Sequence, residues 1–269
     1  MLGEAYQAGG VWYYPSESFN AVQTGLASVQ PDDHASLTTD GERFDQNALA
    51  AAHQTLQLPA IARLTNLDNG RQLLVRIDDR GPASPARLVS VTKRTAQLLG
   101  FPRSGIARVR LEVEEPESRA IAGSLQGAAG PTLTIEAAPR GDVRAVALAP
   151  PPGASGQSGI RVTSDAVSRT DAVTPTLPSV PMHLPEVVLQ VPAEPGPLYV
   201  DLGTFSHREI AERQRARVAG LAPNIERVRH GRTALYLVRV GPLTTVDAAD
   251  ATLDRAIRTG VSDARIVAE

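Results

Sequence analysis

The chain has 269 residues, of which 42% are hydrophobic, and a formal net charge of -2 from 27 basic and 29 acidic side chains. That length predicts about two domains, each large enough to bury a core without disulfides or metals. The near-neutral charge gives no electrostatic reason to expect nucleic acid as a partner, and no apolar run is long enough to span a bilayer. The sequence contains no cysteine, which excludes disulfides, thiolate metal sites and a cysteine nucleophile.

The N-terminal part has the pattern of a β-rich domain. Strands are indicated at residues 61–65 and 73–77, on either side of Asp68-Asn69-Gly70, which is typical of a type I′ hairpin turn. Residues 106–114 alternate apolar and charged side chains, as a strand with one solvated face does. Residues 92–99 predict a short helix that ends at Gly100. Many short strands with few helices indicate a small barrel, which we place at residues 1–120.

The composition then changes to that of a linker rich in proline, alanine and serine. Ten of the 21 prolines lie between Pro150 and Pro197, and no aromatic residue occurs between Phe101 and Tyr199. Such a segment buries too little apolar area to offset the entropy lost on ordering. We therefore predict a flexible linker at residues 121–194, with a candidate packed arm at residues 131–149.

Residues 195–269 have a βαββαβ pattern. Ser206 to Glu209 has the pattern of a capping box that opens a helix through Leu221, and Gly260 ends a second helix. This order predicts an α+β domain of the ferredoxin or ribonucleoprotein type, with a four-stranded antiparallel sheet, two helices on one face and a free opposite face. The strands are expected at residues 199–205, 225–229, 234–240 and 264–267, and the second helix at residues 245–258.

Few residue patterns in the sequence point to metal or nucleotide chemistry. No pair of histidines has metal-ligand spacing, and the chain contains no Gly-x-Ser-x-Gly, phosphate loop or dinucleotide fingerprint. We therefore expect neither a metal nor a cofactor. The remaining candidates for catalytic groups are the carboxylates of aspartate and glutamate.

Asp79 stands out among the carboxylates because the apolar face of Leu73, Val75 and Ile77 ends at it, while Asp78 points to the other side of the strand. Partial desolvation raises the pKa of a carboxyl group, as a general acid near neutral pH requires. Purely structural roles also remain open. The Asp79 side chain either pairs with Arg80 or caps the turn before Pro82, and His53 is a buried core histidine whose hydrogen bonds are satisfied.

Four motifs in order resemble the rare lipoprotein A family. They cover roughly residues 38–100. The motifs are Thr38-x-x-Gly-Glu42-x-Phe-Asp45, then Ala51-Ala-His53-x-Thr-Leu56 with Leu58-Pro59, then Arg63 to Arg71, then Asp79-Arg80-Gly81-Pro82. The resemblance implies a six-stranded double-psi β-barrel. It also implies lytic transglycosylase activity on bacterial peptidoglycan, with a preference for glycan strands that have lost their stem peptides.

The same resemblance implies the site residues. The catalytic positions of the family fall on Asp79, Glu42 and His53. We assign Asp79 as acid and then base, with Glu42 and His53 tuning its pKa or holding the sugar, and the alternative in which Glu42 is the proton donor stays open. Barrel residues that we expect to bind substrate are Thr38, Asp45 and Arg80. Relative to the family pattern, the stretch between Tyr14 and Thr38 is expected to be an insertion that covers or narrows the groove. Trp12, Tyr13 and Tyr14 either stack on sugars or close the barrel.

The tail resembles a SPOR domain, through residues 199–205 and 236–242. SPOR domains bind denuded glycan at division septa, which implies roles in glycan binding for Asp201, Gly203 and Arg239. Glycan strands are thus the expected partner, the chain is expected to be monomeric, and the periplasm is expected because the substrate lies there. An expansin-like protein that binds the wall without cleaving it is the alternative. Binding of RNA to the sheet is disfavoured by a net charge of only +2 over residues 199–269, from 11 arginines and 9 acidic residues.

Overall fold

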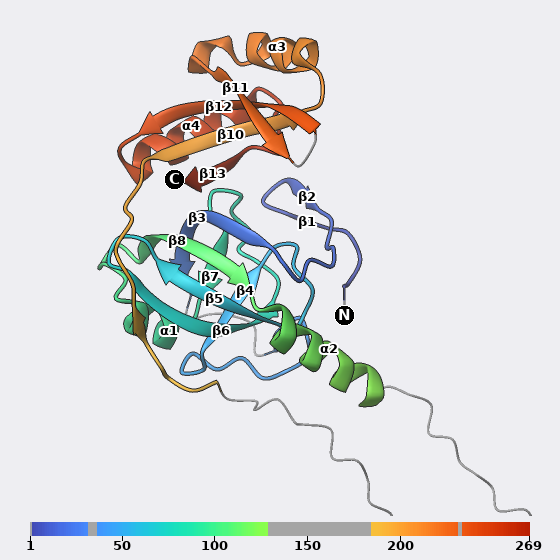
Figure 1. Ribbon diagram of the computed structural model, residues 1–269, viewed down its shortest axis with the longest axis vertical. Coiled ribbons are helices and arrows are strands. Elements are labelled where there is room, and N and C mark those ends of the chain that lie inside the picture. The colour runs from blue at the N-terminus through green and yellow to red at the C-terminus, as the bar shows by residue number, and fades with distance from the viewer. Residues whose placement is uncertain (1, 32–36, 129–183, 231–232) are drawn as a thin grey trace, which may run out of the picture.

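The computed structural model describes residues 2–31, 37–128, 184–230 and 233–269. Figure 1 shows two domains stacked on each other, with the N-terminal barrel below the C-terminal α/β domain. The candidate arm at residues 131–149 and most of the predicted linker lie outside the described residues. Within the described residues, no helix is long and apolar enough to cross a membrane.

The barrel predicted from the sequence is confirmed. Six strands of the described part follow the order β4-β7-β3-β8-β5-β6, and a parallel pairing of β4 with β6 closes the ring. The strands are β3 (Val22–Val29), β4 (Ala50–His53), β5 (Ala60–Asn66), β6 (Arg71–Asp79), β7 (Val89–Val91) and β8 (Ile106–Val113). The short helix α1 (Lys93–Leu99) is also confirmed, with Thr92 as N-cap and Gly100 as a left-handed C-cap at φ 67°.

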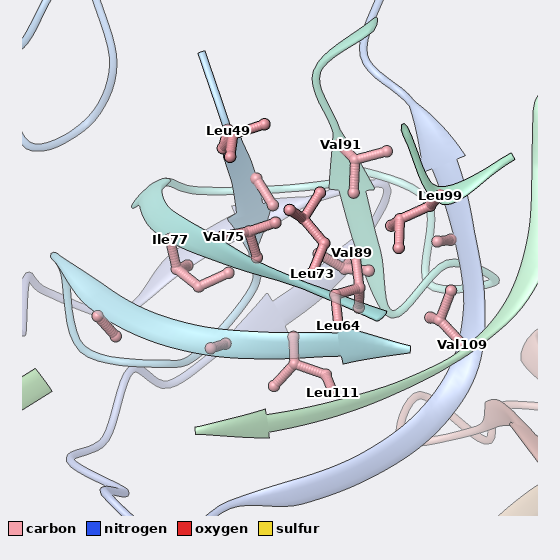
Figure 2. Close-up of a cluster of buried hydrophobic side chains, with 14 of the residues drawn as sticks. Leu49, Leu64, Leu73, Val75, Ile77, Val89, Val91, Leu99, Val109 and Leu111 are labelled. Atoms are coloured by element: carbon pink, nitrogen blue, oxygen red, sulfur yellow. The ribbon is translucent and has the colours of Figure 1, made fainter. Parts of the chain in front are cut away.

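The barrel core follows from alternation along the strands. On β6, Leu73, Val75 and Ile77 are buried while their neighbours are partly exposed, and β8 alternates in the same way. Figure 2 shows these side chains meeting Leu64 and Val109 from neighbouring strands inside the ring. The same alternation places Asp78 and Asp79 on opposite sides of β6.

Two predictions about the barrel are wrong in detail. The hairpin between β5 and β6 forms, but its loop has four residues, 67–70, and only Gly70 among them has positive φ, at 73°. A type I′ turn needs positive φ at two central residues. The expected insertion between Tyr14 and Thr38 is not an addition to the barrel, because it contains β3, which lies between β7 and β8 in the ring.

Segments outside the ring lie against the barrel. β1 (Tyr6–Ala8) and β2 (Val11–Tyr13) form a separate hairpin, so the aromatic residues of β2 do not close the barrel. Helix α2 (Glu115–Ala128) packs on β5 and continues past residue 120. Beyond the gap, β9 (Leu189–Gln190) pairs with the start of β6.

The C-terminal domain has the predicted βαββαβ order and an antiparallel sheet of order β11-β12-β10-β13. Apolar side chains of both long helices join one core cluster on one face of this sheet. The capping box is wrong: His207 is the N-cap and makes no side-chain cap, and the helix ends at Arg217. The elements are β10 (Leu198–Phe205), α3 (Arg208–Arg217), the 3₁₀ turn Ala219–Leu221, β11 (Asn224–His230), β12 (Thr233–Leu243), α4 (Val246–Arg258) and β13 (Arg265–Ala268).

The two domains pack against each other along β13 and β3 (Figure 1). Leu26 of β3 and Leu67 of the barrel are buried in the core cluster of the C-terminal domain. Arg87 of the barrel forms two hydrogen bonds with the carboxylate of Asp250 on α4, at 2.7 and 2.9 Å. The contact therefore combines buried apolar area with a bidentate ion pair.

We predict that Arg87 and Asp250 are energetically coupled. Their side chains are 12% and 32% exposed, so the pair is partly shielded from water. A double-mutant cycle of Arg87→Ala and Asp250→Ala, read by chemical denaturation, should give a coupling of roughly 1–2 kcal/mol. The matched control is the exposed pair Arg208 and Glu212 within α3, whose coupling should be about 0.3–0.5 kcal/mol. Equal couplings at the two pairs would show that the domains do not dock in this way in solution.

Candidate active site

A tight turn brings the Thr-x-x-Gly-Glu motif to the end of β6. Thr38 N donates to Glu42 O at 2.9 Å, and Gly41 takes positive φ, at 90°. The Thr38 hydroxyl lies inside the turn, 2.6 Å from Asp40 Oδ1. Asp40 N donates to Asp78 O at 3.2 Å, which fixes the turn to the strand. Thr38 is buried and therefore shapes the turn rather than facing substrate.

Arg76 of β6 joins the acidic side chains of this turn. Its Nη2 lies 3.0 Å from Asp40 Oδ2 and 2.6 Å from Glu42 Oε1. Beside the turn is a groove of about 490 Å³. Its polar lining comprises Glu42, Arg43, Asp45, Asn47, Arg76, Asp78 and Glu186. We call it the carboxylate groove, and three of its carboxylates, Glu42, Asp45 and Asp78, lie on the turn segment or β6.

Asp78 lines this groove, although the sequence patterns gave it no functional role. Burial, and next the charge of Asp40, raise the pKa of Asp78, with a smaller contribution from Asp79; Arg76 opposes the shift, and the resulting pKa is about 7. A carboxyl group with that pKa is half protonated near neutral pH. The sequence shows Asp78 on the face of β6 opposite the buried side chains. It does not show that Asp40, from a turn far away in sequence, lies beside it.

Asp79 lies on the other side of β6 and is only 5% exposed. Its Oδ1 accepts hydrogen bonds from Thr39 N at 2.9 Å, Thr39 Oγ1 at 2.5 Å and Arg80 N at 2.8 Å. A general acid that is only partly desolvated, as the end of the apolar face predicts, is therefore not what the structure shows, because the turn folds over Asp79 and buries it. The bond from Arg80 N matches the alternative in which Asp79 caps the turn after β6.

Arg80 is covered by the N-terminal segment. Its Nη2 donates to Leu2 O at 2.6 Å and its Nη1 donates to Leu56 O, while burial lowers the pKa of the guanidinium. Tyr6 lies nearby and donates to Gln54 O at 2.8 Å, and burial raises the pKa of its phenol to about 12. The Arg80 guanidinium therefore binds backbone carbonyl groups of the protein. This arrangement does not match the expected contact between Arg80 and substrate.

His53 is 2% exposed and has partners on both ring nitrogens. Its Nδ1 accepts from Thr55 N at 3.1 Å and Leu56 N at 3.2 Å, and its Nε2 lies 3.2 Å from Gln23 Oε1. Burial lowers the pKa of His53 to about 3, so the ring is neutral near pH 7 and donates from Nε2. This is the satisfied core histidine of the alternative interpretation.

The three predicted catalytic side chains do not converge in one groove. Glu42 lines the carboxylate groove, His53 lines a second groove between the domains, and Asp79 is absent from the lining of both. Asp79 is nevertheless tied to the turn of Glu42 through Thr39. Among the described residues, no group of acidic or histidine side chains is arranged to hold a metal ion.

Two of the predicted glycan-binding residues of the C-terminal domain, Asp201 and Arg239, form a buried ion pair. Arg239 Nε lies 3.2 Å from Asp201 Oδ1, its Nη1 lies 2.7 Å from Glu269 Oε1, and its guanidinium lies 4.5 Å from the Tyr199 ring centroid. Burial raises the pKa of Asp201. Gly203 has φ 125°, and a Cβ there would lie 2.9 Å from the Phe205 ring, so the position requires glycine for packing.

Comparison with known proteins places both domains. Residues 22–111 match the family described as lytic transglycolase, and residues 194–266 match the SPOR domain family. Among solved structures, the RlpA SPOR domain from Pseudomonas aeruginosa is 25% identical with a TM-score of 0.25, and covers 27% of this chain and 99% of that chain.

Full-length relatives extend the match across the chain. The endolytic peptidoglycan transglycosylase RlpA of two Pseudomonas aeruginosa strains is 30% and 31% identical over 263 residues, which cover 93% of this chain and 72% of each relative. The protein of the same name from Neisseria meningitidis serogroup A is 42% identical over 110 residues, covering 40% of this chain and 46% of the relative. The chain therefore belongs to the RlpA family of endolytic peptidoglycan transglycosylases.

Proposed function

We propose that the protein is an endolytic lytic transglycosylase that cleaves the MurNAc-GlcNAc bond of peptide-stripped glycan strands and leaves 1,6-anhydromuramoyl ends. The observation that carries this proposal is the carboxylate groove, where a half-protonated acid, Asp78, lies with two further carboxylates. Family membership supports the same reaction. The C-terminal domain would concentrate the enzyme on denuded septal glycan, in the periplasm, and we propose a monomer as the working form.

The reaction needs one group that changes its protonation state during the cycle. A carboxylic acid first protonates the glycosidic oxygen, and the bond from the muramic C1 to that oxygen breaks. The resulting carboxylate then removes the proton from the muramic C6 hydroxyl, whose oxygen attacks C1, so no water is consumed. Proton transfer of this kind accelerates such steps by roughly 10²–10⁴-fold.

Asp78 has the properties of that group. It lines the groove, and burial and its acidic neighbours hold its pKa near 7, so the protonated form is available at neutral pH. Glu42 and Asp45 line the same groove, where they accept hydrogen bonds from sugar hydroxyls and stabilise positive charge on the ring. Arg76 holds Glu42 in place through its 2.6 Å contact.

Asp79, the position to which the family resemblance assigns the reaction, acts in this proposal through Asp78. Three hydrogen bonds hold its Oδ1 in place, and its charge helps to raise the pKa of Asp78. His53 orders the strand that pairs with β6, because Ala52 beside it is the register partner of Asp79. In the C-terminal domain, Asp201, Gly203 and Arg239 would shape the glycan-binding face of the sheet.

An expansin-like binder without catalysis is the competing function. It is favoured by the cover that Leu2 and Tyr6 place over Arg80 and by the burial of Asp79. The two functions differ in their products, since only an enzyme releases fragments with anhydro ends.

The released sugars test both the reaction type and the identity of the proton donor. Wild-type protein incubated with denuded sacculi should release fragments that mass spectrometry identifies as anhydro-ended. Asp78→Asn should lower the rate roughly 10²–10⁴-fold, because asparagine cannot donate and recover the proton. Asp79→Asn keeps an amide oxygen that can accept the bonds now made to Oδ1 but removes the negative charge, and it should lower the rate at pH 7 by about tenfold.

Three outcomes decide between the assignments, provided that circular dichroism shows folded variants. Full activity of Asp78→Asn with complete loss in Asp79→Asn would make Asp79 the donor and overturn the role given to Asp78. Reducing ends in the products would mean hydrolysis. Binding of sacculi without any release by the wild type would establish the expansin-like function.

The dependence of the rate on pH reports the pKa of the proton donor. Because the donor must be protonated and its pKa is about 7, the initial rate should fall as pH rises through about 7. Asp79→Asn removes a negative charge that raises this pKa, so the falling limb should move to lower pH. Rates with soluble glycan fragments between pH 5 and 9 would test both statements, and an unmoved limb in the variant would contradict the coupling.

A further inference from the structure

A second groove, of about 400 Å³, lies where the barrel meets the C-terminal domain. The barrel contributes the β1–β2 hairpin, the start of β3 and the end of β4, and the C-terminal domain contributes residues 262–267. Figure 1 shows β13 next to β3, with the β1–β2 hairpin at the same junction. We call this the junction groove, and its size is within the range of small-ligand sites.

The lining of the junction groove combines an aromatic ring with polar side chains from both domains. Trp12 is the only tryptophan of the chain and is 56% exposed, although its neighbours Val11 and Tyr13 are buried. Thr24 of the barrel and Arg265 of β13 line the groove as well. The indole of Trp12 therefore offers an accessible aromatic face to a molecule in the groove.

This combination matches a sugar better than an apolar ligand. A pyranose ring has an apolar face of C–H bonds, which stacks on an indole, and a rim of hydroxyl groups, which take hydrogen bonds from side chains such as threonine and arginine. Muramic acid without its stem peptide also carries a free lactyl carboxylate. Two arginines line the groove. Arg87 is held by the carboxylate of Asp250, whereas Arg265 is exposed and can pair with such a group, in a lining that also contains the acidic Asp263.

The junction groove is separate from the carboxylate groove but connected to it through β4. Ala50 at one end of β4 lines the carboxylate groove, and His53 at the other end lines the junction groove. At about 3.3 Å per residue, these ends lie roughly 10 Å apart. A ligand in the junction groove would contact both domains at once, next to the pairing that positions the end of β6.

We propose that the junction groove binds a saccharide, namely a peptide-free stretch of glycan, between Trp12 of the barrel and Arg265 of the C-terminal domain. The identity of this ligand rests on the proposed function. The docked C-terminal domain then forms part of the substrate-binding surface of the barrel, in addition to its own sheet face. Binding of glycan at this place stabilises the docked arrangement, since the ligand contacts both partners.

The single tryptophan makes the proposal directly measurable. Peptide-free (GlcNAc-MurNAc) fragments are mixed rapidly with the wild-type protein, and the emission of Trp12 is recorded before cleavage proceeds. A saturable change in intensity or wavelength is expected. Arg265→Ala should weaken the binding about tenfold, whereas Arg208→Ala, an exposed arginine on α3, should leave it unchanged. Chito-oligosaccharides of equal length, which lack the lactyl carboxylate, should bind more weakly than the muramic fragments.

The outcomes separate this inference from the proposed function. Cleavage of glycan by a wild type whose Trp12 emission never responds would overturn the inference and leave the function intact. A saturable response without any cleavage would support the groove and overturn the enzymatic function. Identical titrations of Arg265→Ala and wild type, or of chito-oligosaccharides and muramic fragments, would overturn the assignment of Arg265.

Discussion

Two consecutive aspartates at the end of β6 put two carboxylates on opposite sides of one strand. The turn of residues 37–43 folds over this end, so that Asp79 is enclosed by hydrogen-bond donors while Asp78 lies at the carboxylate groove. Burial beside other acids disfavours ionisation of Asp78, so its contribution to stability falls as pH rises from about 4 to about 7 and the full destabilisation is present above pH 7. An electrostatic cost of this kind is typical of active sites, where a catalytic acid needs a pKa shifted from its ordinary value.

The docking of the C-terminal domain changes how its role is understood. A SPOR domain on a free tether would only raise the local concentration of substrate. Here β13 lies against β3, Leu26 joins the core of the other domain, and Arg87 binds Asp250, so the two domains share a groove. A ligand in that groove would therefore contact both domains, and residues 191–194, which follow β9, bond to the barrel through Val191 N to Gly70 O and Glu194 N to Leu67 O.

Local patterns predicted much of the fold. The alternation along β6 and β8, the capped helix α1 and the βαββαβ order all follow from short-range periodicity. β3 escaped detection because Gly25, Ala27 and Ser28 give it neither a strong apolar face nor a high strand propensity.

The site was harder to predict because its geometry depends on contacts between distant residues. The enclosure of Asp79 comes from Thr39, and the cover of Arg80 from Leu2, which lies far away in sequence. The raised pKa of Asp78 likewise depends on Asp40 of the turn. Motif spacing identifies residues of this kind, but it does not reveal which of two adjacent carboxylates faces the groove.

The protonation of Asp78 is the most direct test of this account. Carboxyl carbon chemical shifts, recorded by NMR on selectively labelled protein and assigned by comparison with Asp78→Asn, report the titration of each aspartate. The account predicts that Asp78 titrates with a midpoint near 7. A midpoint near 4, the ordinary value for aspartate, would contradict the claim that this side chain is the poised acid of the groove.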